Sequence, residues 1–262
     1  MNPPVVFYNP TQLITPGRVV AVMRHGQRED YVNIKWGVTA RRPQDPNLSE
    51  AGKAEIRLVA EDLLQELVSE GIDTNEVIIM ASPLIRTVQT AEIIAQTLNI
   101  PGKICLEPCI IEESFFIGVG YGHYPTKKVP FPIFISPEEL SQTYHNINLE
   151  YAPFYTPIFF KDDSNLNGIQ EMDCEGSDER DSKVLIQRRC GNFIDNYVLN
   201  PGSFLGQYRA IIIIGHGSSV AACAQRLTNE SSKWDGPETG SWSLFLERLH
   251  WQSKQNGWHK PI

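Results

Sequence analysis

Short runs of apolar, mostly β-branched residues recur along the chain and end abruptly at polar residues. They cover residues 19–23, 77–80, 104–107 and 208–214, and the last of them contains four consecutive isoleucines. An uninterrupted apolar run of this length is typical of a strand that is buried on both faces. We therefore expect these runs to form the centre of a mostly parallel sheet.

Between the expected strands, apolar side chains recur at the spacing of an α-helix. Ser49 is a suitable N-cap for the clearest helix, which Gly71 ends. Ser82 and Pro83 are expected at the cap and the first helical position of a second helix that runs to about residue 98. Further helices are expected near residues 137–144, 182–198 and 219–227.

The alternation of strands and helices predicts an α/β fold with three layers, in which helices cover both faces of a mostly parallel central sheet. The 262 residues, 41% of them hydrophobic, predict a single domain over residues 1–262. Residues 114–178 are rich in proline, glycine and aromatic residues and are interpreted as a long insertion over one face of that sheet. An edge strand is expected within residues 240–249, whereas residues 251–262 indicate no element.

Residues 31–47 combine aromatic side chains, arginines and prolines, and they are expected to form a loop rather than a regular element. Trp36, Arg41 and Arg42 could line a substrate entrance. A surface loop with a packed tryptophan accounts for the same residues equally well.

Charge and cysteine content restrict the classes of function. The net charge of −8, from 31 acidic and 23 basic residues, argues against binding of nucleic acid or of an anionic membrane surface. No stretch approaches the roughly 20 apolar residues of a membrane span, and no secretory signal is expected at the N-terminus. The five cysteines lack a C-x-x-C pair and indicate neither a disulfide framework nor a zinc site, which favours the cytoplasm, with the nucleus also compatible.

Cationic and imidazole side chains follow three of the expected strands. Arg24, His25 and Arg28 follow the first, Arg86 the second and His216 the last. In a parallel sheet with right-handed crossovers these strand ends lie along one edge, where ligands bind in open α/β sheets. Taken alone, each of these groups is explained equally well by an ordinary charged turn at the end of a strand. Together they favour a site for an oxygen-rich anion such as phosphate.

The motifs around these residues resemble one family. They are Arg24-His25-Gly26, the run Leu48-Ser49-Glu50-Ala51-Gly52, residues 81–91 and Gly215-His216-Gly217. Their order and spacing resemble the histidine phosphatase superfamily, also called phosphoglycerate mutase-like. Within it, Arg28, the Glu107 to Glu112 run and residues 134–140, 148–151 and 216–219 are most similar to the phosphatase domain of the suppressor of T-cell receptor signalling proteins.

This resemblance implies the phosphoglycerate mutase-like fold and a metal-independent phosphatase that needs no cofactor. His25 would attack phosphorus and form a phosphohistidine, while the phosphoryl oxygens would be held by Arg24, Arg28, Arg86 and His216. Glu112 would protonate the leaving oxygen and then activate water. Glu113 directly follows, where an aromatic residue is expected in the most similar relatives, so Glu113 stays an alternative to Glu112.

The resemblance leaves the substrate open between phosphotyrosine and other aryl or alkyl phosphates, carried by a small molecule or by a phosphoprotein. A catalytically weak or inactive scaffold that retains the phosphate pocket is a second hypothesis, and phosphoglycerate mutase activity is a less favoured third. The apolar content of residues 115–160 is compatible with a homodimer interface or with a lid over the pocket.

Overall fold

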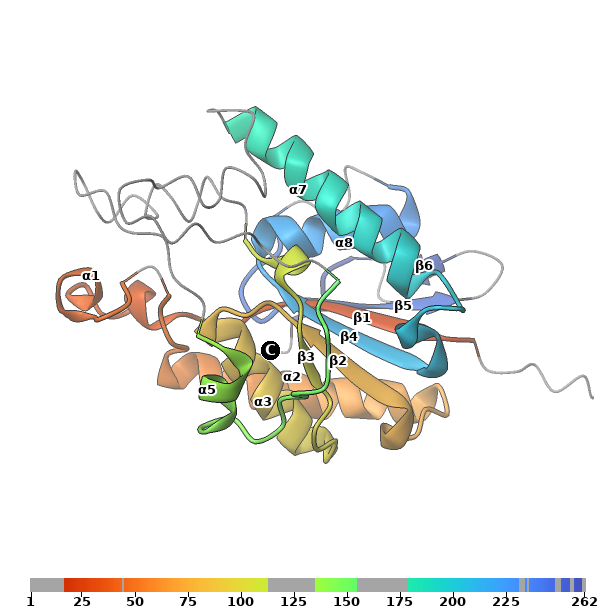
Figure 1. The fold of residues 1–262 in the computed structure, drawn as a ribbon, viewed down its shortest axis with the longest axis horizontal. Coiled ribbons are helices and arrows are strands. Elements are labelled where there is room, and N and C mark those ends of the chain that lie inside the picture. Colours follow the sequence, from red (N-terminus) through yellow and green to blue (C-terminus); the bar gives the residue numbers. More distant parts are fainter. Residues whose placement is uncertain are drawn as a thin grey trace, which may run out of the picture.

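In the part of the chain that the structure describes, a six-stranded sheet has the order β3-β2-β4-β1-β5-β6 (Figure 1). The computed structural model describes residues 17–43, 45–112, 135–154, 179–230, 234, 236–247, 251–254 and 257–260. β3, β2, β4 and β1 are parallel, whereas β5 and β6 continue the sheet antiparallel. The strands are β1 (Val19–Arg24), β2 (Val77–Ala81), β3 (Ile104–Leu106), β4 (Ala210–Gly215), β5 (Trp242–Glu247) and β6 (Trp251–Ser253).

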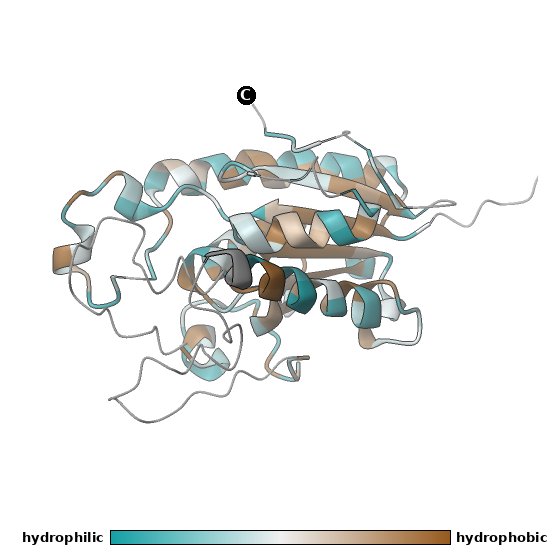
Figure 2. Cartoon of the chain, turned by 90° about the horizontal axis from the view of Figure 1, so that it is seen from above, coloured by the Kyte–Doolittle hydropathy of each residue, from teal (hydrophilic) through white to brown (hydrophobic). Residues whose placement is uncertain are grey.

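Helices cover both faces of this sheet (Figures 1 and 2). One face is covered by α2 (Glu50–Ser69) and α3 (Ile85–Leu98), and the other by α7 (Glu179–Phe193) and α8 (Gly217–Thr228). The expected three-layer α/β fold is therefore confirmed. The short elements are η1 (Glu29–Tyr31), α1 (Trp36–Thr39), η2 (Thr74–Glu76), η3 (Pro108–Ile110), α5 (Pro137–Ser141), η6 (Ile194–Val198) and η7 (Phe204–Gln207).

Strand β1 shows why the apolar runs are uninterrupted. Val19, Ala21 and Met23 belong to the core beneath α2 and α3, whereas Val20 and Val22 belong to the core beneath α7 and α8. Successive side chains of a strand point to opposite faces, so a sheet that is covered on both sides requires apolar residues at every position. Figure 2 shows these hydrophobic strands lying between helices whose outer faces are hydrophilic.

The antiparallel end of the sheet differs from the sequence prediction. The strand within residues 240–249 is present as β5, but β5 is paired on both sides, with β1 and with β6. The edge of the sheet beyond β5 is formed by β6, which lies within residues 251–262, where no element was expected. An edge strand is paired on one side only and tolerates polar residues, which explains why the half-exposed β6 lacks a strong apolar signal.

Two further local predictions are corrected. Ser82 does not cap the second helix, because α3 begins at Ile85 with Leu84 at the N-cap position. Residues 31–47 are not entirely loop, since they contain the single helical turn α1. By contrast, Ser49 is confirmed as the N-cap of α2, where its hydroxyl oxygen accepts a hydrogen bond from the Gly52 amide at 3.0 Å.

Part of the expected insertion lies along β3. The Ile104 amide donates to the Asn146 carbonyl at 2.9 Å, and the Asn148 amide donates to the Ile104 carbonyl at 2.8 Å. The helix expected near residues 137–144 is present as α5. Residues 114–134 and 155–178 lie outside the described residues, as do Glu113 and the N-terminal residues 1–16.

The start of α2 packs directly on the loop that follows β1. A methyl group on Gly52 would lie 2.3 Å from the carbonyl oxygen of Gln27, and one on Gly26 would lie 2.7 Å from Cγ1 of Ile56. Neither contact is sterically possible without movement of the backbone or the core. The two glycines thus allow the close approach that fixes the loop after His25.

We expect Gly52→Ala to destabilise the protein by about 1–3 kcal/mol, because the added methyl group overpacks this contact. Helix propensity alone predicts the opposite sign, a gain of up to about 1 kcal/mol. Gly191→Ala in α7 is the matched control, since a methyl group there meets only Cδ of Arg226 at 3.9 Å. Urea unfolding of both variants measures the difference; a stabilised Gly52→Ala variant would contradict the packing.

Candidate active site

The candidate site lies at the carboxyl end of the three central parallel strands. His25 follows β1, Ser82 follows β2 and His216 follows β4. The register pairs Arg24 with Gly215 and Ala81 with Ile214, so the three strands end side by side. The imidazole rings of His25 and His216 are consequently 5.3 Å apart between centroids, although 191 positions separate them (216 − 25).

His25 is fully buried, and its two ring nitrogens have different environments. Nδ1 lies 2.8 Å from the Gly26 carbonyl oxygen, to which it can only donate, so Nδ1 carries the proton. Nε2 is buried and has no hydrogen-bond partner among the described residues. Burial, followed by the charges of Arg86 and Arg24, holds the pKa of His25 well below its usual value. The ring is therefore neutral, with an unshared electron pair on Nε2.

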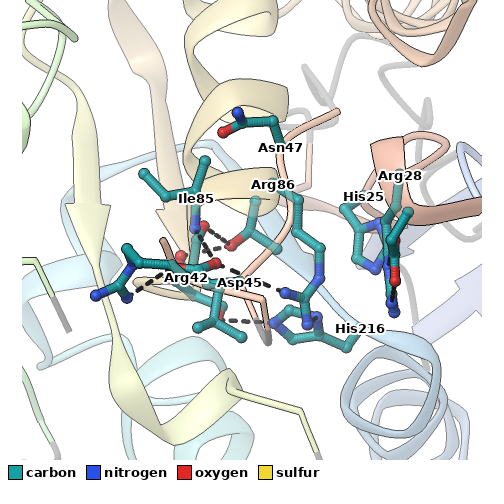
Figure 3. A network of polar contacts seen from close by, with 12 residues as sticks. His25, Arg28, Arg42, Asp45, Asn47, Ile85, Arg86 and His216 are labelled. Atoms are coloured by element: carbon teal, nitrogen blue, oxygen red, sulfur yellow. Dashed lines mark hydrogen bonds and ion pairs between the residues drawn. The ribbon is translucent and has the colours of Figure 1, made fainter. Parts of the chain in front are cut away.

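His216 is the second buried imidazole, and both of its ring nitrogens have partners (Figure 3). Arg86 donates from Nη2 to Nδ1 at 3.2 Å, which leaves the proton on Nε2, and Nε2 donates to the Ser82 hydroxyl at 2.8 Å. Burial and then the charge of Arg86 hold the pKa of His216 well below its usual value. Ser82, expected as a helix cap, instead fixes the orientation of this ring.

Arg24 and Arg28 approach the site from the segment around His25. Arg24 donates from Nη1 to the Pro237 carbonyl at 2.7 Å, and its guanidinium lies against Gly217. Arg28 is buried and donates from Nε to Asp30 at 2.8 Å, with a second contact from Nη2 to the same carboxylate. The charges of both arginines lower the pKa of His25, which places them within electrostatic range of its ring.

Arg86 contacts His216 directly. It is completely buried in the first turn of α3, where the sequence predicted it. Its Nη1 lies 3.7 Å from the carboxylate of Asp45, a residue for which no function was expected from the sequence. Figure 3 shows Arg86 between Asp45 and His216.

Several buried N–H groups of the site have no acceptor within the described residues. They are Nε of Arg24 and both Nε and Nη1 of Arg86. A buried donor without a partner costs about 1–3 kcal/mol, and an anion with several oxygens would satisfy such donors. With the unpartnered Nε2 of His25, the arrangement is a cluster of positively charged groups beside a nucleophilic nitrogen.

Glu112 follows the short turn η3, which is fixed from one side by Glu107. The Glu107 carboxylate accepts from the Cys109 amide at 2.9 Å, from the Tyr151 hydroxyl at 2.7 Å and from the Phe154 amide at 2.8 Å. Glu112 itself is buried, with 3% of its surface exposed. The turn is therefore tied to the segment around residues 151–154.

Helix α7 fixes the same turn from the other side. Arg189 is buried and donates to the carbonyls of Pro108 at 3.3 Å and Ile111 at 3.2 Å. Ile110 in turn lies close to Gly215 at the end of β4, with its carbonyl 3.3 Å from where a methyl group on that glycine would be. The backbone that leads to Glu112 is thus held in place beside the strand ends. The position of the Glu112 carboxylate relative to His25 stays a prediction. The choice between Glu112 and Glu113 as general acid also stays a prediction.

Comparison with known proteins finds one family whose model matches part of this chain. Residues 20–115 match the model of the histidine phosphatase superfamily (branch 1), a stretch that contains Arg24, His25, Arg28, Arg86 and Glu112 but not His216. No curated protein sequence matches the chain. The more specific similarity to suppressor of T-cell receptor signalling proteins stays a prediction.

One solved structure supports the fold, and a second is reported as a weaker similarity. The ecdysone phosphate phosphatase from Bombix mori, solved with tungstate, superposes with a TM-score of 0.61 at 16% identity, covering 94% of this chain and 95% of that one. A mycobacterial glucosyl-3-phosphoglycerate phosphatase covers 91% of this chain and 98% of its own at 16% identity, with a TM-score of 0.48. The chain therefore has the phosphoglycerate mutase-like histidine phosphatase fold.

Among the residues that the structure describes, no group of three or more His, Cys, Asp or Glu side chains is arranged to hold a metal ion. No helix in this part of the chain combines the length and the apolar character needed to cross a membrane.

The two neutral histidines predict a specific dependence of stability on pH. Below a pH of about 6.5 the unfolded chain binds protons that the folded His25 and His216 do not, so stability falls as the pH falls. The slope is up to about 1.4 kcal/mol per pH unit for each histidine. Urea unfolding between about pH 6.5 and 5.5 should therefore give a shallower slope for His25→Gln than for the wild type. Equal slopes in the wild type and in His25→Gln would contradict a buried neutral His25.

Proposed function

We propose that this protein is a phosphomonoester phosphatase that acts through a phosphohistidine at His25. The observation that carries the proposal is the state of His25: a buried neutral imidazole whose Nε2 lacks a partner, beside arginine N–H groups that lack acceptors. A neutral imidazole is the nucleophilic form, and most of the catalytic demand of phosphoryl transfer is positioning and charge stabilisation. The family match over residues 20–115 supports the same reaction class.

In the first step, Nε2 of His25 attacks phosphorus, the N–P bond forms and the bond to the leaving oxygen breaks. Glu112 supplies the proton that the leaving oxygen takes up. In the second step, Glu112 accepts a proton from water, the water oxygen attacks phosphorus, and the N–P bond breaks to release phosphate and neutral His25. Arg24, Arg28 and Arg86 hold the phosphoryl oxygens in both steps. His216 does so through the N–H of Nε2, which turns from the Ser82 hydroxyl to a phosphoryl oxygen when substrate binds.

We infer that the substrates are aryl or alkyl phosphates, phosphotyrosine among them, in a small molecule or a phosphoprotein. Tyr31 supports an apolar or aromatic leaving group, because its half-exposed ring lies 4.6 Å from the guanidinium of Arg28. The structurally similar Bombix mori protein is by its description an ecdysone phosphate phosphatase, which makes a bulky apolar phosphate ester a reasonable member of a test panel.

We expect the purified protein to hydrolyse p-nitrophenyl phosphate in the presence of EDTA. His25→Ala should lower kcat by on the order of 10³-fold or more, because the nucleophile is lost. An acid-labile, alkali-stable phosphoenzyme should be trapped with labelled substrate in the wild type and not in the variant. Wild-type turnover no greater than that of His25→Ala would reject the enzyme and, if tungstate still binds, would favour the phosphate-binding scaffold.

The role of Glu112 is tested by comparing Glu112→Gln with Glu113→Gln. Loss of a general acid lowers kcat by about 10²–10⁴-fold, and the loss is greater for an alkyl phosphate than for p-nitrophenyl phosphate, whose leaving group needs little protonation. We expect this dependence on the leaving group for Glu112→Gln alone. If Glu113→Gln shows it instead, the two roles are exchanged.

A further inference from the structure

A buried carboxylate lies inside this positively charged site. The side chain of Asp45 is 1% exposed, and both of its oxygens have polar contacts. Oδ1 accepts from the Ile85 amide at 2.9 Å and lies 3.7 Å from Nη1 of Arg86, whereas Oδ2 accepts from Arg42 at 2.8 Å (Figure 3). A negative charge beside the arginines of this site requires an explanation, because it opposes the binding of a phosphate.

The backbone around Asp45 is held in place by its neighbours in sequence. Pro46 restricts Asp45 to extended conformations. The Asn47 carbonyl accepts from the Glu29 amide at 2.8 Å, and the Leu48 amide donates to the Gln89 side chain at 2.7 Å. Asp45 is therefore carried by a segment that is anchored both to the loop after His25 and to α3, the helix that bears Arg86.

Asp45 attracts the Arg86 guanidinium electrostatically but accepts no hydrogen bond from it. At 3.7 Å the Asp45 oxygen is within ion-pair distance of Nη1, yet Nη1 and Nε of Arg86 have no hydrogen-bond acceptor among the described residues. The third nitrogen, Nη2, donates to His216. The Arg86 side chain is thus fixed between an anion and an imidazole, and its remaining N–H groups stay available to a ligand.

Asp45 also determines where α3 begins. Its carboxylate accepts the Ile85 amide, one of the N–H groups that a helix start leaves without an intrahelical partner. Arg86 is the next residue, so the same carboxylate fixes both the backbone and the charged end of the Arg86 side chain. Arg28 shows a parallel arrangement, since it is paired with the buried Asp30.

We propose that Asp45 is a positioning residue that holds Arg86 in the geometry for binding a phosphoryl group, with Arg42 anchoring its outer oxygen. The proposal rests on the proposed function for the identity of the anion. Asp45 acts through Arg86 and does not touch the substrate. The opposing interpretation is that Asp45 occupies the place of the phosphate and must be displaced.

The test measures tungstate binding by calorimetry, and kcat and KM with p-nitrophenyl phosphate, for Asp45→Asn. Asparagine keeps an acceptor for the Ile85 amide but removes the charge that faces Arg42 and Arg86, so we expect a folded protein with a lowered thermal midpoint. Tungstate affinity and kcat/KM should each fall by about 10-fold or more, because truncation of a buried charge pair leaves its partner misplaced. Asp73→Asn is the matched control: Asp73 also caps a helical turn, but at the start of β2, at the opposite end of the sheet, and its substitution should change neither quantity.

A double-mutant cycle separates positioning from a general effect on structure. In an Arg86→Met background, Asp45→Asn should alter the remaining tungstate affinity less than 2-fold, since the group through which it acts is absent. Equal fold-changes in both backgrounds would overturn the proposal. Tighter tungstate binding by Asp45→Asn would also overturn it and would favour the displacement model.

The two proposals fail in distinguishable ways. A wild type that binds tungstate but does not turn over substrate rejects the phosphatase, while the binding cycle still decides the role of Asp45. A wild type that neither binds tungstate nor turns over substrate overturns both.

Discussion

The parallel pairing of β2, β4 and β1 is the constraint on which the site depends. Because the register pairs Arg24 with Gly215 and Ala81 with Ile214, three strands end at the same level and direct the residues that follow them to one edge. That pairing requires helices on both faces, since parallel strands are joined by crossovers that place helices there. The apolar strands that form the core therefore also bring the imidazoles and guanidinium groups together.

Bringing these groups together creates an electrostatic problem, which the chain resolves in two ways. The histidines stay neutral, because burial and the neighbouring arginines lower their pKa values. Each arginine is paired with an oxygen of the protein. Arg24 donates a hydrogen bond to a backbone carbonyl, and Arg28 and Arg86 each form an ion pair with a buried carboxylate. Buried charges are tolerated only when paired or hydrogen-bonded. For Arg24 and Arg86 the pairing also orients the N–H groups that have no acceptor among the described residues.

The backbone around the site is fixed as firmly as its charges. Gly26 and Gly52 allow α2 to contact the loop after His25, and no larger side chain fits at either position. The turn before Glu112 is held by Glu107 on one side and by Arg189 on the other. Enzymes that work by positioning need such rigidity, because small displacements of a reacting group cost large factors in rate.

The sequence by itself determined the central strands, the main helices and the strand-end residues Arg24, His25, Arg86 and His216 that meet at one edge. Those features follow from local patterns, namely apolar runs, helical spacing and caps such as Ser49. Tertiary structure alone decided the position of β6 at the edge of the sheet and the partners of Ser82, Asp45 and Arg189. The Ile85 amide and Asp45 are 40 positions apart, and Ser82 and His216 are 134 apart. No local sequence pattern encodes such pairs, because strand register and helix packing in the folded chain determine which distant residues come into contact.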